Sequence, residues 1–294
     1  MNNKLVLPAV LVLAVALAGC TQPQGSPIFN GPTTGDQGDN GGDTATKFTP
    51  QGGLTIDFSA GVDTYFNGET ATFVANLKNT GQFEAENIQL RLYGASWAAG
   101  GDWKHVDSLA AFDKSNNFIQ GKQSVTFSRT VDTALGAGQQ DTYTIGLQTF
   151  YEYNATTRAK FTVMDQQTFE EEGRTRSQMS NTQYGAPVHI TFLGETPYPY
   201  NGGSEIIIPV KIENVGQGSI NSSEVTLNVR VENGPKLEDC SGLVDLSSGN
   251  RVRCTLASDE VGLGSAPLKT YTFIAEANYT YAQDNSVTVT VKGQ

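Results

Sequence analysis

One short stretch of the 294-residue chain gathers side chains that could take part in acid–base or metal chemistry. The segment GGDWKHVDS places His105 between Asp102 and Asp107. One imidazole with two carboxylates has no spacing diagnostic of a metal centre, and zinc sites need three or four protein ligands. The other histidine, His189, falls in an expected strand and is interpreted as structural. We therefore expect no catalytic residue, no metal site and no cofactor, with a hydrolase or a hydrolase accessory as the less favoured alternative.

The cysteine nearest the N-terminus, Cys20, marks the boundary between apolar and polar sequence. The 15 residues from Leu5 to Gly19 are apolar and follow Lys4, which is the layout of a secretory signal and short for a spanning helix of about 20 residues. The motif LAGC at Leu17–Cys20 resembles the lipobox of lipoprotein signal peptides. This resemblance implies cleavage before Cys20 and a lipid on its thiol. An ordinary signal peptide and an uncleaved anchor are the alternatives.

The sequence predicts a signal peptide at 1–19 and a lipidated cysteine with a flexible tether at 20–51, because this segment is rich in Gly, Pro, Asp, Thr and Gln. The whole chain carries a formal net charge of −11. Without a Lys/Arg cluster it has no phosphate-binding footprint, so we expect no nucleic acid partner. The anionic lipids of a membrane would also repel the negatively charged chain, so attachment to the membrane needs the covalent lipid on Cys20. These features predict an exported protein that faces outward from a cell membrane.

Cys240 and Cys254 are the other two cysteines, and an exported protein meets oxidising conditions. Pairing them would close a loop of about 15 residues and contribute roughly 3 kcal/mol. The segment between them is expected to form strand, glycine turn and strand, which could bring the two together. We predict a disulfide, with two free thiols as the alternative.

Three sequons offer acceptor sites for N-glycosylation, at Asn154, Asn221 and Asn278. The alternation of side chains along its expected strand points Asn278 away from the buried face. Asn154 and Asn221 are expected at turns.

An internal repeat sets the domain organisation. Residues 135–163 align without gaps on residues 263–291, with Leu-Gly, Thr-Tyr-Thr, Tyr-x-Tyr and Thr-Val in register. Two related copies are fewer than a solenoid requires. We expect domains at 52–166 and 186–294, joined by a connector at 167–185.

Each copy shows the period-2 alternation of a strand with one buried face. From Tyr143 to Tyr153 the larger apolar side chains fall on odd positions, and only Phe150 breaks the pattern. About seven such strands per copy predict an all-β chain with two tandem immunoglobulin-like β-sandwiches. Tyr143 and Tyr271 each follow a Leu-Gly pair and open a strand, so we expect tyrosine corners whose hydroxyls bond to backbone upstream.

The strand–Asn-x-Gly–strand segments around Asn79–Gly81 and Asn214–Gly216 resemble those of CARDB-type immunoglobulin-like domains. The resemblance covers most of both copies. It implies a surface protein of a bacterium or an archaeon. Modules of this kind serve as spacers, as adhesins and as appendages to enzymes, so it supports the fold more strongly than the function.

The two copies differ most in the insert from Ala95 to Gly121, which holds Trp97, Trp103, His105 and Asp107. Aromatic groups on a loop could stack on sugar rings or anchor a protein partner. The alternative is that one or both tryptophans fill the sandwich core.

Together these features favour a membrane-anchored extracellular lipoprotein with a binding, adhesion or scaffold role, whose ligand would be a surface protein or a glycan. The alternative is a subunit of a surface fibre or coat that assembles through edge strands. The sequence leaves the oligomeric state open.

Overall fold

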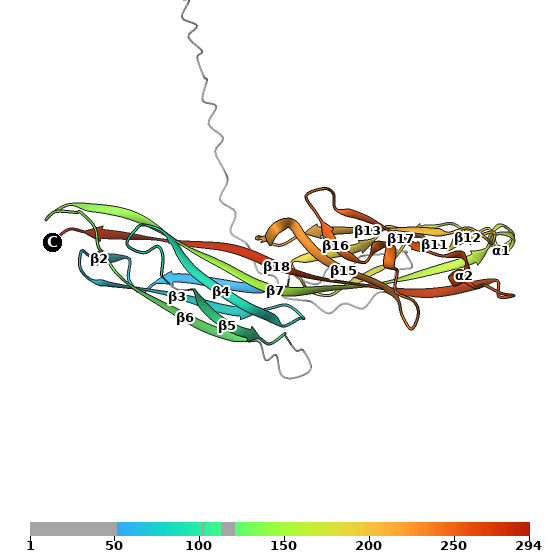
Figure 1. Ribbon diagram of the computed structural model, residues 1–294, viewed down its shortest axis with the longest axis horizontal. Coiled ribbons are helices and arrows are strands. Elements are labelled where there is room, and N and C mark those ends of the chain that lie inside the picture. The colour runs from blue at the N-terminus through green and yellow to red at the C-terminus, as the bar shows by residue number, and fades with distance from the viewer. Residues whose placement is uncertain (1–51, 102, 113–120) are drawn as a thin grey trace, which may run out of the picture. The chain divides into compact units, whose positions relative to one another are not determined.

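The computed structural model describes residues 52–101, 103–112 and 121–294 (Figure 1). The signal peptide at 1–19, the tether at 20–51 and the lipidation site Cys20 lie outside these residues. The described chain is nearly all β, as predicted, and its strands form two sandwiches. None of its helices is long and apolar enough to cross a membrane.

The first sandwich packs a three-stranded sheet against part of a larger sheet. The three-stranded sheet has the order β1-β3-β6. The larger sheet contributes β5, β4, the first half of β7, the second half of β18, and β2. The bounds are β1 (Leu54–Ala60), β2 (Thr64–Phe66), β3 (Thr70–Asn79), β4 (Ala85–Gly94), β5 (Lys104–Leu109), β6 (Lys122–Thr130), β7 (Gln140–Asp165) and β18 (Leu268–Lys292).

The second sandwich repeats this plan with a sheet of order β10-β13-β17. Facing it are β16, β15, the first half of β18, the second half of β7, and the short strands that pair with these. The bounds are β8 (Ser177–Gln178), β9 (Asn181–Gln183), β10 (Val188–Phe192), β11 (Glu195–Thr196), β12 (Tyr198–Tyr200), β13 (Ile206–Asn214), β14 (Ser219–Ile220), β15 (Glu224–Val231), β16 (Gly242–Asp245) and β17 (Arg251–Leu256). The helices are short: α1 (Gln166–Glu171), α2 (Ser258–Val261), and the 3-10 turns η1 (Asn221–Ser223) and η2 (Glu238–Cys240).

Alternating burial explains why these segments are strands. In β3 the side chains of Ala71, Phe73, Ala75 and Leu77 are buried, and their neighbours point outward. Such a pattern buries one face of a pleated strand and leaves the other in water. The cores gather large rings, which include Phe73 and Phe127 in the first sandwich and Phe192 and Phe273 in the second.

The two longest strands, β7 and β18, run through both sandwiches (Figure 1). They pair antiparallel over 25 residue pairs, from Leu268 opposite Met164 to Lys292 opposite Gln140. At about 3.4 Å per residue this ladder is about 80 Å long. The sequence repeat predicts that the first domain ends at residue 166 and that the second begins at residue 186. The backbone hydrogen bonds of the ladder join strands of both repeats in one shared sheet. Each sandwich contains half of each long strand, so neither is complete without the other.

Four tyrosines lie at the junction of the sandwiches, at the middle of the ladder. Tyr151 and Tyr153 of β7 stand opposite Tyr281 and Tyr279 of β18, and the rings of these cross-strand pairs lie 5.7 and 6.5 Å apart. All four are buried. Burial raises the pKa of all four, most strongly at Tyr151, Tyr153 and Tyr279. They therefore remain neutral phenols at any physiological pH.

The two Asn-x-Gly turns meet this tyrosine cluster in equivalent ways. Oδ1 of Asn79 accepts hydrogen bonds from the Gly81 amide (3.0 Å) and the Tyr153 hydroxyl (3.4 Å). Asn214 accepts from the Gly216 amide (3.1 Å) and the Tyr281 hydroxyl (2.8 Å). Each turn is thus fixed to the long strand of its own repeat.

Glycines allow the backbone to pass very close to the junction. A β-carbon on Gly52 would lie 2.7 Å from backbone atoms of Gly185 and 2.8 Å from Cα of Gly81. Those distances are below contact, so a larger residue at position 52 would force these segments apart. The described chain therefore begins at the junction.

A candidate binding face on the first sandwich

The structure separates the two tryptophans of the insert. The side chain of Trp97 is only 9% exposed, and its ring packs 6.3 Å from Phe73 and edge-on to Tyr143 at 5.9 Å. Trp97 therefore belongs to the core of the first sandwich, as the alternative reading of the insert proposed. Trp103 is 40% exposed and immediately precedes the edge strand β5.

Trp103 lies on the outer face of the shared sheet, where it is held by its neighbours. The Arg91 guanidinium stacks over its ring at 4.6 Å, and the ring of Phe150 is 5.8 Å away. Arg91 is itself fixed by Gln148, whose Oε1 accepts bonds from Nε (3.0 Å) and Nη2 (2.7 Å) of the guanidinium. A stacked and doubly bonded guanidinium has lost most of its rotational freedom, so this group is pre-organised.

Tyr93 adds a second exposed ring to the same face. It follows Arg91 by two residues on β4, is 41% exposed, and lies flat over Gly146 of β7. Burial of the hydroxyl and the nearby carboxylate of Asp284, which accepts its hydrogen bond, raise the pKa of Tyr93. The bond to Asp284 holds the ring down on the sheet. We call Tyr93, Trp103, Phe150 and Arg91 the aromatic face.

Sequence reasoning found one of the three rings of this face. Trp103 was a candidate because the insert differs between the repeats. In the sequence, Phe150 stands out only as a break in the alternation, and the structure explains the break, since Phe150 points outward against Trp103. No local signal separated Tyr93 from an ordinary exposed tyrosine, because its place beside Trp103 depends on strand pairing.

His105 and Asp107 lie on β5 next to this face and form an exposed pair. Nε2 of His105 is 3.1 Å from Oδ1 of Asp107. The third member of the sequence cluster, Asp102, lies outside the described residues. Among those described, no three histidine, cysteine, aspartate or glutamate side chains come together so that they could hold a metal ion.

All three sequons border one groove of about 530 Å³ at the junction. Asn154 and Asn278 are cross-strand neighbours on β7 and β18, and Asn221 belongs to η1. The expectation that Asn154 lies at a turn was wrong, because it lies near the middle of a 26-residue strand. Asn278 points outward as expected and is exposed. Four carboxylates share the groove: Glu84, Glu86, Glu152 and Glu224. Glycosylation stays a prediction.

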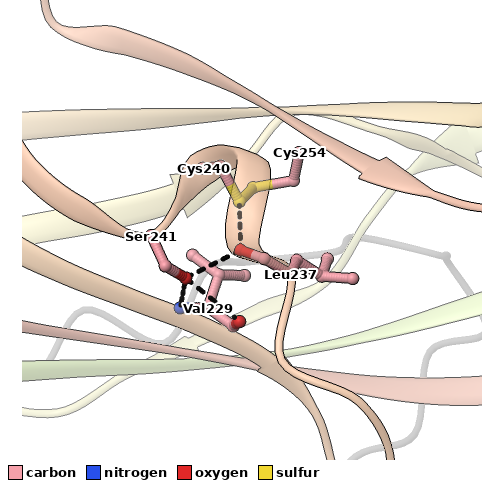
Figure 2. The surroundings of a disulfide bond; sticks show 5 residues. All are labelled: Val229, Leu237, Cys240, Ser241 and Cys254. Atoms are coloured by element: carbon pink, nitrogen blue, oxygen red, sulfur yellow. Dashed lines mark hydrogen bonds between the residues drawn. A yellow bond between two sulfur atoms is a disulfide. The ribbon is translucent and has the colours of Figure 1, made fainter.

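The predicted disulfide between Cys240 and Cys254 is present, with Cα atoms 4.9 Å apart (Figure 2). It joins η2 to β17, and both cysteines are buried. The neighbouring Ser241 hydroxyl donates to the Leu237 carbonyl (2.7 Å) and accepts from the Val229 amide of β15 (3.0 Å). The bridge therefore links the two sheets of the second sandwich.

Only one of the two expected tyrosine corners forms. The Tyr271 hydroxyl donates to the Val261 carbonyl, ten residues upstream, as the motif requires. The expectation was wrong for Tyr143. Its ring packs against Trp97 of the insert, and its hydroxyl bonds to the Asp141 side chain. The core tryptophan has no counterpart in the second repeat, so the local sequence of Tyr143 could not reveal this difference.

Comparisons with known proteins identify no family. No family model matches the chain, and no curated protein matches it. Among solved structures, the collagen adhesin of S. aureus is 11% identical, with a TM-score of 0.17 and coverage of 83% of this chain and 93% of that chain. The Enterococcus faecalis protein MSCRAMM ACE, described as binding its ligands by the collagen Hug model, is 9% identical, with a TM-score of 0.16 and coverage of 81% and 95%. TM-scores this low carry no argument about this chain.

Proposed function

We propose that this chain is an exported binding protein, held on the outside of a membrane by a lipid on Cys20, that attaches to another surface through its aromatic face. The observation that supports this is the exposure of Trp103 and Tyr93 on a sheet face that alternation normally makes polar. Large rings held in place by polar partners are typical of interface anchors, because little side-chain entropy is lost on binding.

The shared ladder suits a protein that must transmit a load. Tandem domains usually move relative to each other unless their interface is large. Here β7 and β18 continue from one sandwich to the other, and four buried tyrosines fill the junction. A ligand bound on the first sandwich therefore acts on both together.

Three of the sheet edges, at β17, β5 and β16, argue against the alternative of a fibre built through edge strands. The edge strand β17 carries Arg251 and Arg253, and the edge strand β5 carries Lys104. Charges on an edge oppose pairing with another chain. The edge strand β16 exposes Leu243 but is only four residues long. A native gel of the mature protein tests this, since a fibre subunit would form a ladder of assemblies.

The binding role is tested by attaching the protein to beads through its N-terminal segment and measuring bead retention under flow. The beads would be tested on films of cell-wall polysaccharide, films of matrix protein, and albumin as background. We expect Trp103→Ala to abolish retention above background. The matched control is Phe66→Ala, because Phe66 of β2 is 41% exposed but lies away from the aromatic face.

Stability measurements keep the result interpretable. Trp103 lies at the surface, so its removal leaves no core cavity and should cost less than about 2 kcal/mol of unfolding free energy. Retention that is unchanged in a folded Trp103→Ala protein would contradict the proposed binding face. The anchor is tested separately by mass spectrometry of detergent-extracted protein. A mature form that keeps Lys4 would rule out lipidation at Cys20.

A further inference from the structure

The aromatic face has the chemistry of a surface for an uncharged polymer. Its rings lie on the open outer face of the sheet, and none of its four residues borders the groove at the junction. Sites for small molecules are concave and bury most of the ligand surface, which a flat sheet face cannot do. A ligand for this face must therefore present a flat side of its own over several residues.

The charges of the face nearly cancel, although the chain as a whole is at −11. Arg91 supplies one positive charge, and its guanidinium is stacked on Trp103. Asp284 supplies a negative charge and is bonded to Tyr93. On β5, Asp107 supplies a second negative charge beside the His105 ring, and the exposed Lys104 supplies a second positive charge. Glu86 and Glu152 lie beyond Phe150 at the groove, where they would repel an anionic partner. Among its described residues the aromatic face itself has neither a basic nor an acidic cluster, so charge complementarity favours a neutral ligand.

The remaining polar groups can form hydrogen bonds with hydroxyls. Oε1 of Gln148 is used by Arg91, while its Nε2 has no acceptor among the described residues and can donate two bonds. The Asp284 carboxylate can accept more bonds than the one from Tyr93. Rings offer a negative face to the partly positive C–H groups on the flat side of a sugar. Planar donors and acceptors between exposed rings thus match a carbohydrate.

The spacing of the rings sets the length of that carbohydrate. Trp103 lies beside Arg91, so Tyr93 is offset from it by two residues along the sheet, or about 7 Å. Phe150 stands opposite Gln89, four residues from Tyr93 along β4, or about 13 Å. One sugar ring cannot cover these positions together, whereas consecutive rings of a chain can.

We infer that the aromatic face binds a neutral polysaccharide, with successive sugar rings stacked on Trp103 and Tyr93 and hydroxyls bonded by Gln148 and Asp284. This inference rests on the proposed function, because it names the ligand class of the same face.

The test is a pull-down on insoluble cellulose, chitin and mannan, with polygalacturonate and heparin resins as anionic comparisons. The mature protein is expected to bind at least one neutral polysaccharide and neither anionic resin. Trp103→Ala and Tyr93→Ala should each weaken that binding about tenfold or more. Phe66→Ala should bind as the unmodified protein does. Gln148→Ala should weaken binding at an unchanged melting temperature, which a merely structural role for the face would not produce.

Two results would overturn the inference, and they differ in what they say of the proposed function. The protein could bind no neutral polysaccharide and yet be retained on a protein film in a way that depends on Trp103. That result would refute a carbohydrate ligand but would still support the aromatic face as a binding face. Polysaccharide binding that is unchanged in folded Trp103→Ala and Tyr93→Ala proteins would refute the carbohydrate site on this face. If these variants also kept bead retention, the proposed function would fail with it.

Discussion

Alkaline pH should unfold both sandwiches together, because the tyrosines at their junction hold their protons more tightly in the folded chain. Burial raises the pKa of Tyr151, Tyr153 and Tyr279 above the ordinary value of 10.0. In the unfolded chain these phenols would ionise near pH 10. Their contribution to stability is therefore fully present below pH 10 and is lost as the pH rises toward the folded-state pKa.

The magnitude follows from the number of protons. Each phenol that stays protonated only in the folded state lowers the free energy of unfolding by about 1.4 kcal/mol per pH unit. Three of them give a slope of about 4 kcal/mol per pH unit above pH 10. A total stability of about 5–15 kcal/mol would then be exhausted roughly one to four units above pH 10.

The assay follows phenolate absorbance and far-ultraviolet circular dichroism in one titration. Of the 11 tyrosines, Tyr151, Tyr153 and Tyr279 should ionise only as the sheet signal disappears. Tyr151→Phe is the matched variant, since the Tyr151 hydroxyl is buried without a well-aligned partner and its loss should cost little at neutral pH. The variant should remove one proton from the slope. If all 11 phenols ionise near pH 10 while the sheet signal persists, the tyrosine cluster does not protect its protons as argued.

Three further changes have outcomes set by individual contacts. Asn79→Ala leaves the Phe83 and Leu109 carbonyls without their donor and should lower the free energy of unfolding by roughly 3 kcal/mol. The equivalent Asn214→Ala should cost only about 1 kcal/mol because Asn214 is exposed, and equal losses in urea unfolding would contradict the role of burial. Replacing Cys240 and Cys254 by serine should remove roughly 3 kcal/mol and lower the melting temperature by about 6–12 °C, and an unmoved melting curve would show that the loop is held by other contacts. Trp97→Ala should cost roughly 3–5 kcal/mol in the same assay, and a loss below 1 would mean that the ring is not core.

The sandwich fold was predictable because each strand records its burial in its own sequence. Alternation along β3 or β15 needs no knowledge of distant residues, and the same pattern appeared in both repeats. The disulfide was predictable for a similar reason, since Cys240 and Cys254 are close in sequence. The alternation lies within single strands and occurs in both repeats, and the two cysteines are close in sequence, so neither prediction requires knowledge of which distant strands pair.

The shared ladder and the aromatic face were not predictable because they depend on which strands pair. Strands usually have about five or six residues, so the sequence predicts a strand from Tyr143 to Tyr153 and a turn at Asn154, where the structure has one strand of 26 residues. Phe150 and Tyr93 become a site only when β4, β5 and β7 lie side by side. Pairing between distant segments leaves no trace in the periodicity of any one of them.

The entry of the chain at Gly52 has a mechanical consequence. The middle of the ladder lies at Glu152 and Thr280, with 12 residue pairs on either side, and Gly53 approaches Tyr151 beside it. If the protein is held through its N-terminal segment, the force therefore acts near the middle of the ladder and not at either end of it. Gln148 under the aromatic face is four residues from that centre, or about 13 Å. A ligand there pulls on a short lever arm, so tension produces little torque on the distal ends of the two sandwiches.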